Sequence, residues 1–184
     1  MLTIDEQRCL LQLARETLVA HLAGGAPPQP VQLADPHAHS GAFVTLLLDG
    51  DLRGCIGYPG AKQSLAEVVS RCAVASATED PRFPPVDADD VDRLTIEISV
   101  LTPIVPIHDV AEIEVGRHGL VIEQGFRRGL LLPQVASDYG WDRETFLEHT
   151  CVKAGVPRGA WKMGAKVFKF EAQVFSEEEL GARG

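Results

Sequence analysis

The stretch "GAFVTLLLDGDLRGCIGY", residues 41–58, decides the centre of the predicted fold. Ala42–Leu48 is an apolar run typical of a strand, and Asp49-Gly50 is a strong turn signal. We therefore expect Leu52–Gly57 to return as the antiparallel partner of the first strand. Within this second strand the charge of Arg53 and the thiol of Cys55 interrupt the apolar pattern, and a glycine stands near the cysteine on either side.

The regions around this hairpin contain helix and strand signals. Two pairs of residues, Thr3 with Glu6 and Ser64 with Glu67, match the capping box, in which a hydroxyl and a carboxylate each accept a hydrogen bond from an unpaired amide at a helix start. The expected helices are Thr3–Leu22, Ser64–Thr78 and Asp142–Ala154, and the further strands are Leu94–Leu101, a hairpin within residues 118–133, and Lys166–Phe175.

Two of these strands show an alternating pattern. In Leu94–Leu101 the apolar residues at 96, 98 and 100 alternate with Thr95, Glu97 and Ser99, as in a strand with one polar face. In Lys166–Phe175 the residues expected to face the core are Phe168, Phe170, Ala172 and Val174. Locally paired strands interleaved with a few helices predict an α+β fold with a mainly antiparallel sheet flanked by helices.

Composition narrows the class of protein. The chain has 184 residues and a formal net charge of −9, which argues against binding to nucleic acid or anionic lipid, because their phosphates attract the opposite charge. No apolar run approaches the roughly 20 residues of a membrane span, and the start "MLTIDEQRC" lacks the features of a signal peptide. The four cysteines are far apart and form no CxxC, which favours reduced thiols and a cytoplasmic location.

Cys55 is the candidate reactive group. On a strand, Arg53, Cys55 and Gly57 share one face, and a guanidinium two positions away is expected to favour the thiolate. The flanking glycines Gly54 and Gly57 leave room for a ligand to approach the backbone. Such a site suits a small anionic ligand or a nucleophilic thiol. The alternative is structural, with Cys55 in the core and Arg53 paired with a carboxylate. Cys9, Cys72 and Cys151 lie in expected helices, where packing explains them.

Several motifs together resemble the AMMECR1 family. The most specific are "LRGCIG" (52–57) and "GLLLPQVA" (129–136). Further matching segments are "GAFVTL" (41–46), "EDPRFPPV" (79–86), "IEISVLTP" (96–103), "WDRETFLEHTCVKAGVP" (141–157) and "FKFEAQVFSE" (168–177). The resemblance covers most of the chain and implies a single AMMECR1 domain over residues 1–184, with a larger and a smaller subdomain.

The resemblance implies partners but no established activity. Proteins of this kind are associated with a Memo-like protein and a radical SAM protein in the AmmeMemoRadiSam system, of which this chain would be the A component. The chain has no CxxxCxxC motif of its own, so an iron–sulfur cofactor is not implied, and the cofactor, if any, stays unknown.

The resemblance also marks candidate site residues. The family's signature falls on Arg53, Gly54, Cys55, Gly57, Asp80, Arg82 and Phe83, and the polar face of the next strand adds Glu97 and Ser99. We expect Cys55 as the nucleophile, Arg53 and Arg82 as groups that hold an anion, and Asp80 and Phe83 as supports of the loop. For Arg82 the alternative is a salt bridge with Asp80 that fastens the loop.

His37 and His39 precede the first strand and would project to the same side of an extended segment. They suit two metal ligands or a base for Cys55, but no third ligand is identified, and solvent-exposed loop polarity is the alternative. Two functional hypotheses follow from the sequence: an enzyme that acts on a small anionic molecule through Cys55, or a non-catalytic scaffold that binds partner proteins.

Overall fold

A computed structural model describes residues 1–29, 40–60 and 63–182. The chain divides into two compact units. The larger, called the first unit, consists of residues 1–100 and 173–184, and the second unit consists of residues 101–172. His37 and His39, the candidate metal ligands, lie outside the described residues.

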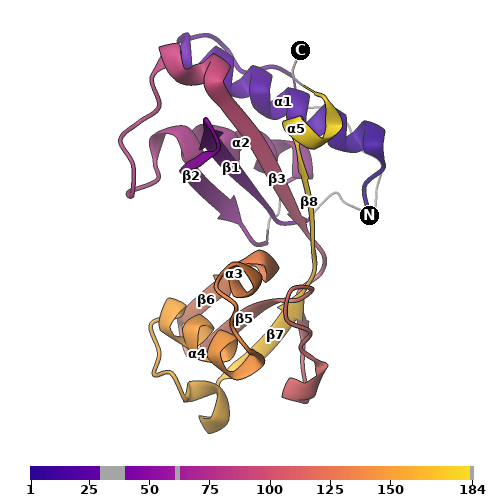
Figure 1. Ribbon diagram of the computed structural model, residues 1–184, viewed down its shortest axis with the longest axis vertical. Helices are drawn as coiled ribbons and strands as arrows, with labels where there is room; N and C mark the ends of the chain where they lie inside the picture. Colours follow the sequence, from indigo (N-terminus) through magenta and orange to yellow (C-terminus); the bar gives the residue numbers. More distant parts are fainter. Residues whose placement is uncertain (30–39, 61–62, 183–184) are drawn as a thin grey trace. The chain divides into compact units, whose positions relative to one another are not determined.

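The first unit is built on a four-stranded sheet with the order β2-β1-β3-β8 (Figure 1). Its strands are β1 (Ala42–Leu48), β2 (Asp51–Tyr58), β3 (Leu94–Leu101) and β8 (Ala172–Ser176). Its helices are α1 (Ile4–Leu22), α2 (Leu65–Thr78), the 3-10 helix η1 (Ala88–Arg93) and α5 (Glu177–Leu180). Strand β1 pairs antiparallel with both β2 and β3, which confirms the predicted hairpin.

Local sequence accounts for the boundaries of these elements. Asp49 and Gly50 have φ values of 52° and 92°, the left-handed conformations that a tight hairpin turn requires. Both predicted capping boxes are present, at Thr3 for α1 and at Ser64 for α2. Thus the turn and the caps fix where the hairpin and the two long helices begin.

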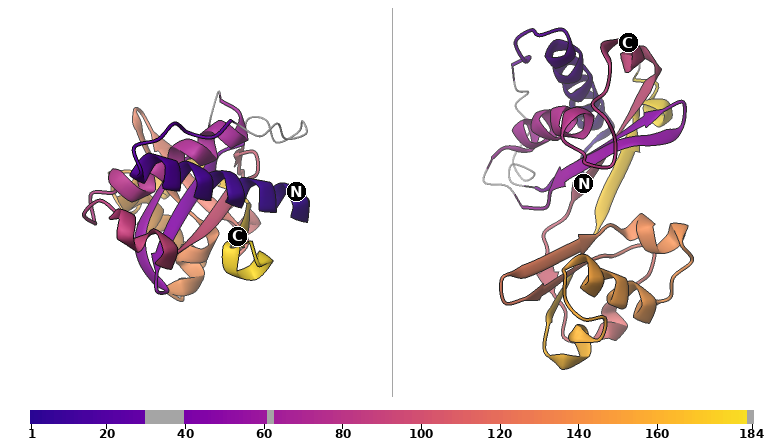
Figure 2. Two further views of the ribbon diagram at one scale, coloured as in Figure 1. Left: turned by 90° about the horizontal axis from the view of Figure 1, so that it is seen from above. Right: turned by 90° about the vertical axis from the view of Figure 1, so that its left-hand side faces the viewer.

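Helices α1 and α2 lie on the same side of the sheet (Figure 2). Their apolar faces and the inward side chains of the strands form one core, which includes Leu10, Leu18, Val69, Val44 and Ile98, all fully buried. The other face of this sheet carries Phe43, Thr45 and the odd-numbered residues of β2 that follow Arg53. This second face holds the candidate site residues Cys55, Gly57, Glu97 and Ser99.

The second unit has its own four-stranded sheet, with the order β4-β7-β5-β6. Its strands are β4 (Val105–Pro106), β5 (Gly119–Gln124), β6 (Arg127–Leu131) and β7 (Lys166–Phe170), and its helices are η2 (Val110–Glu112), α3 (Pro133–Asp138), α4 (Arg143–Lys153) and η3 (Ala160–Met163). Helix α4 begins after its predicted cap, Asp142, and packs Phe146, Leu147 and Cys151 against Leu120 and Ile122 of β5.

The prediction of one strand over Lys166–Phe175 is wrong. The segment forms two strands, β7 and β8, which belong to different sheets, and Glu171 separates them. At this residue the backbone N–H donates to the Thr102 hydroxyl, and the carbonyl accepts from the Thr102 amide, each at 2.8 Å. The break changes which residues face inward: Phe175 is buried, whereas Val174, expected in the core, is 41% exposed.

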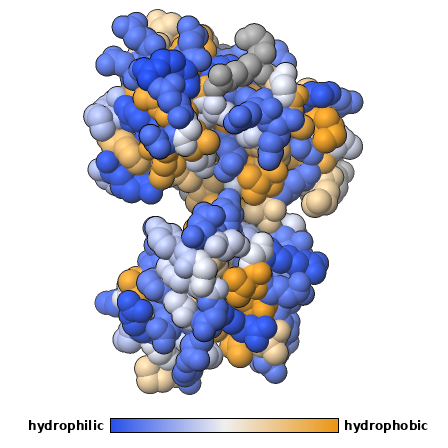
Figure 3. Space-filling view, viewed as in Figure 1, coloured by the Kyte–Doolittle hydropathy of each residue, from blue (hydrophilic) through white to orange (hydrophobic). Residues whose placement is uncertain are grey.

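Within the described residues, no helix combines the length and apolar character needed to cross a membrane. On the face visible in Figure 3, hydrophobic residues lie in groups among hydrophilic ones. A protein surface normally has this mixed character.

Candidate functional site

The hexapeptide Leu52–Gly57 lies on β2, the edge strand of the first sheet, and contains a β-bulge. Leu47 pairs with Leu52, but the next residue back, Leu46, pairs with Gly54, so Arg53 has no partner of its own. A regular two-residue hairpin would place Thr45 opposite Gly54. The extra residue instead places Thr45 opposite Cys55 on the face not covered by the helices.

Arg53 binds the chain's own backbone. Its two terminal nitrogens donate to the carbonyl oxygens of Pro84 and Pro85, at 2.7 and 2.9 Å. These prolines belong to the loop between α2 and η1, which runs along the outer side of β2 (Figure 1). The Arg53 guanidinium therefore holds this loop. The structural alternative for Arg53 expected a carboxylate as its partner, but its partners are two backbone carbonyls.

Asp80 is the centre of the loop's hydrogen bonds. Its side chain is only 3% exposed, and it accepts from the backbone N–H of Cys55 at 2.9 Å. It also accepts from the Arg82 backbone N–H at 3.1 Å and from the Arg82 guanidinium at 3.0 and 2.7 Å. Hydrogen bonds from Arg82 hold the pKa of the Asp80 carboxyl well below its usual range. The predicted alternative for Arg82, a salt bridge that fastens the loop, is confirmed.

The Cys55 thiol lies in a row of three side chains across the sheet. Thr45 is directly opposite Cys55 on one side and Glu97 of β3 on the other, and the Thr45 hydroxyl donates to Sγ at 3.3 Å. Burial raises the pKa of the thiol, the charges of Asp80 and Glu97 raise it further, and Thr45 and Arg82 oppose them. The thiol is therefore protonated at neutral pH.

This result differs from the expectation that Arg53 favours the thiolate. The guanidinium that acts on Cys55 is that of Arg82, and its effect is smaller than that of burial. The bulge and the two proline carbonyls explain the difference, because they engage the Arg53 side chain elsewhere. The geometry does not test nucleophilic attack by Cys55, but it removes the charge that was expected to activate it.

The space beside the two glycines is filled by the protein itself. A Cβ on Gly54 would lie 2.0 Å from the backbone oxygen of Ser76 in α2, and one on Gly57 would lie 2.2 Å from the Phe43 ring. The Ser76 hydroxyl accepts from the Ile56 amide at 2.9 Å and donates to a β1 carbonyl at 2.7 Å. These glycines therefore allow close packing of β2 against α2 and under Phe43.

The remaining candidates have different surroundings. Glu97 is half-buried in the row with Thr45, and Ser99, expected on a polar face, is only 1% exposed and pairs with Phe43. Phe83 is half-buried, and the Arg82 guanidinium carbon lies 5.4 Å from the centre of its ring. All four cysteines are free, and Cys9 is exposed although packing was expected to explain it.

Sequence reasoning missed Thr45, Ser76 and the two proline carbonyls. Ser76 and the two prolines contact the hexapeptide from 20 to 32 residues away, so no local pattern marks them. Thr45 could have been found only by placing the bulge correctly. Among the described residues, no three His, Cys, Asp or Glu side chains come together as a metal ion would need.

Around the hexapeptide lies an exposed surface that we call the proline-loop surface. Leu52 is 42% exposed, the Arg82 side chain is 55% exposed, and Pro84 and Pro85 are also exposed, next to the half-buried Phe83. Its members are apolar apart from one guanidinium. Arg53 donates hydrogen bonds to the Pro84 and Pro85 carbonyls, and Asp80 accepts hydrogen bonds from Arg82. The loop part of this surface is therefore held in place before any partner binds.

Comparisons with known proteins agree with this fold. The AMMECR1 family profile matches residues 11–175. A protein of Methanosarcina barkeri is 43% identical, over 97% of this chain and 94% of its own, and one of Methanocaldococcus jannaschii is 42% identical over the same shares. The crystal structure of the uncharacterised protein PH0010 from Pyrococcus horikoshii has a TM-score of 0.84 and 41% identity, and the match covers 95% of this chain and 92% of that one. This chain belongs to the AMMECR1 family.

Proposed function

We propose that this protein is the A component of an AmmeMemoRadiSam system and acts there as a binding subunit. The observation that carries the proposal is the engagement of the hexapeptide's polar groups within the chain. Arg53 binds two carbonyls, and Asp80 binds the Cys55 amide and Arg82. Groups held in this way define a rigid surface, whereas a nucleophilic site needs an activated thiol.

The partners in this proposal are the Memo-like protein and the radical SAM protein that the family resemblance suggests. The proline-loop surface supports recognition of a protein, because exposed apolar side chains around an arginine are typical of interface centres. Prolines add to this, since their fixed φ lowers the entropy lost on binding. We also propose a cytoplasmic location, which is supported by four free cysteines.

A small anionic ligand at Cys55 is less well supported. The charged groups that act on the thiol are one guanidinium, Arg82, and two carboxylates, Asp80 and Glu97. Arg82 already donates two hydrogen bonds to Asp80. This local balance does not favour an added negative charge. Catalysis through Cys55 is likewise disfavoured by its raised pKa.

Binding to the two purified partners tests the proposal. The informative variant is Leu52→Lys, which places a charge in the middle of the proline-loop surface at a residue that is 42% exposed. The matched control is Val19→Lys on α1, where the side chain is 43% exposed. We expect a micromolar complex, weakened at least about tenfold by Leu52→Lys only, as for a residue near an interface centre. No complex with either partner at micromolar concentrations, or equal effects of both variants, would contradict it.

A further inference from the structure

Strand β6 is an uncovered edge of the sheet in the second unit. The strand order is β4-β7-β5-β6, so within the described residues β6 pairs with β5 on one side and with no strand on the other. In the first unit, by contrast, the Cys55 amide of the edge strand β2 donates to Asp80 in the neighbouring loop. An open edge presents backbone groups that can pair with another chain.

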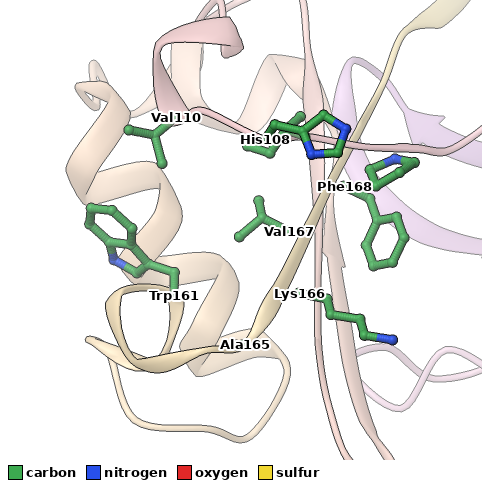
Figure 4. A pocket seen from close by; sticks show the side chains of 9 residues that line it. His108, Val110, Trp161, Ala165, Lys166, Val167 and Phe168 are labelled. Carbon is green, nitrogen blue, oxygen red and sulfur yellow. The ribbon is translucent and has the colours of Figure 1, made fainter.

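The opposite edge of the same sheet is covered by β4. There the Val167 carbonyl accepts from the Ile107 amide at 3.0 Å, and a hollow of about 520 Å³, which we call the β7 groove, lies beside β7. Figure 4 shows Trp161, Val110 and Val167 on one side of β7, and Lys166 on the other. The apolar wall of the groove and its ammonium group therefore face different ways.

The register of the β5–β6 hairpin shows which backbone groups of β6 are free. Gln124 and Arg127 pair on either side of the two-residue turn, and such a closing pair exchanges hydrogen bonds within the ladder. Alternate residues then direct their backbone groups outward, and in β6 these are Arg128 and Leu130. Neither forms a backbone hydrogen bond outside the hairpin with any residue that the structure describes. Two amides and two carbonyls are therefore available along this edge.

The side chains beside the open edge carry more positive than negative charge. Arg127 and Arg128 are both exposed. Arg128 Nε lies 3.3 Å from a carboxylate oxygen of Glu123. The Arg127 guanidinium donates to the Gly155 carbonyl instead, which leaves its charge unbalanced.

Lys153 and Phe126 extend this surface. The backbone of Lys153, at the end of α4, packs over β6, since a Cβ on Gly129 would lie 2.6 Å from the Lys153 carbonyl carbon. Lys153 is exposed and makes no ion pair among the described residues. In the turn Phe126 is fully exposed, and aromatic side chains are enriched at protein interfaces. The edge thus combines free backbone groups, an excess of positive charge and an apolar side chain.

This charge selects the occupant of the edge. A second copy of the chain fits poorly, because pairing two β6 strands would bring the arginines of both copies together. Arginine on an edge strand discourages pairing with basic or apolar strands, but it attracts an acidic one. Nucleic acid is also negatively charged, but it cannot continue a ladder of backbone amides and carbonyls.

We propose that β6 binds an extended acidic segment of a partner protein, which adds to the sheet as a fifth strand. In the antiparallel orientation, one residue of the segment exchanges two hydrogen bonds with Arg128, and the residue two positions earlier exchanges two with Leu130. Carboxylates opposite Arg128 and Arg127 meet positive charge, and an apolar side chain packs beside Leu130. This surface lies wholly within the second unit and is independent of the proposed role of the hexapeptide.

Fluorescence anisotropy with labelled peptides tests the proposal. The full chain is titrated into the amidated peptide Thr-Val-Thr-Val-Thr-Glu-Glu and into its counterpart that ends in Lys-Lys. The variants are Arg128→Glu, which reverses a charge, and Leu130→Pro, which removes an outward amide and keeps the hydrogen bonds of the ladder. The matched control is Lys162→Glu, because Lys162 is also exposed and paired with a glutamate, but lies over the Trp161 ring beside the β7 groove.

The acidic peptide should bind saturably and about tenfold more tightly than the basic one, as for two partly exposed charge pairs. Arg128→Glu should reduce this ratio below about threefold, and Lys162→Glu should leave it unchanged. Leu130→Pro should weaken binding of the acidic peptide about fivefold, as for a lost hydrogen bond. If circular dichroism shows that Leu130→Pro is unfolded, the Arg128→Glu titration decides.

Four results would overturn the proposal. They are no saturable binding of the acidic peptide, equal affinity for the two peptides, equal effects of Arg128→Glu and Lys162→Glu, and undiminished binding by a folded Leu130→Pro variant.

Discussion

The hexapeptide region and the β7 groove treat their polar side chains in opposite ways. In the first, Arg53 and Asp80 bind backbone groups and Arg82, and the hydroxyl of Ser76 joins α2 to two strands. In the second, Lys166 lies at the rim of a hollow and pairs with none of the described residues. The hexapeptide Leu52–Gly57, a specific motif of the sequence, thus makes hydrogen bonds that hold the fold together.

This difference shows that the residues of a distinctive motif can be engaged in holding the fold. Glycine, arginine, cysteine and aspartate are typical of active sites, yet here the same residue types make a bulge, a close approach between a strand and a helix, and a fastened loop. The groove, in contrast, has an ordinary composition and no sequence signature. The predictions below test whether the two regions differ as described.

The largest effect is expected for Asp80→Asn. The change removes the charge that accepts from Arg82 and places an amide near the Cys55 N–H, so we expect a loss of about 3 kcal/mol in the free energy of unfolding. Urea denaturation measures it. The control is Asp49→Asn, because Asp49 pairs with Arg93 at a site where both side chains are more than half exposed. A loss below about 0.5 kcal/mol at Asp80 would mean that its hydrogen bonds do not hold the loop.

The next largest effect is expected for Gly54→Ala. The added methyl would meet the Ser76 backbone oxygen at 2.0 Å, and neither backbone can move away cheaply, so we expect a loss of about 2 kcal/mol. At Gly60 the same substitution meets nothing within 4 Å and should change stability by less than about 0.5 kcal/mol. Thermal unfolding of both variants gives the comparison, and equal melting temperatures would rule out the proposed close approach.

A pair of variants compares the two regions directly. Arg53→Gln leaves the Pro84 and Pro85 carbonyls without their donor and should cost about 1 kcal/mol of unfolding free energy. Lys166→Gln removes a side chain with no ion pair among the described residues and should cost less than about 0.5 kcal/mol. If denaturation finds the larger loss at Lys166, the contrast between the regions is wrong.

A smaller effect is expected from acid, which should lower the free energy of unfolding by protonating Asp80. The pKa of Asp80 is lowered in the folded protein. The ionised Asp80 therefore makes its full contribution to the free energy of unfolding above its pKa in the unfolded chain, about 3.9. This contribution is lost as the pH falls towards the pKa of Asp80 in the folded protein. Between pH 7 and pH 3.5 the wild type should lose about 0.7 kcal/mol more than Asp80→Asn does. Urea midpoints at several pH values measure this difference. Parallel pH profiles would show that Asp80 is not the group responsible.

Signals that lie close together in the sequence predicted the framework. The Asp49-Gly50 turn and the caps Thr3, Ser64 and Asp142 agree with the structure. The alternation of β3 agrees as far as Ile98 and fails at Ser99, which is buried. In each case the interacting groups are at most a few residues apart. Local chemistry is therefore sufficient to place the hairpin and the helices.

Contacts between distant segments were not predictable in the same way. The Arg53 side chain binds carbonyls 31 and 32 residues away, and the Cys55 amide binds a carboxylate 25 residues away. The division of residues 166–175 between two sheets depends on a single residue, Glu171, whose neighbours continue the alternation of a strand. The sequence motifs predicted Arg53, Asp80 and Arg82 as site residues, but the backbone groups that Arg53 and Asp80 bind are known only from the structure.

The most direct test of the central claim is the reactivity of Cys55. Alkylation by iodoacetamide is followed by peptide mass spectrometry from pH 6.5 to pH 10, with the exposed Cys9 of the same chain as the internal reference. Burial raises the pKa of Cys55, so its rate should lag behind that of Cys9 at pH 7 and rise only above the ordinary thiol value of about 8.5. Alkylation of Cys55 faster than Cys9 at pH 6.5, abolished by Cys55→Ser, would contradict the account and restore the nucleophile.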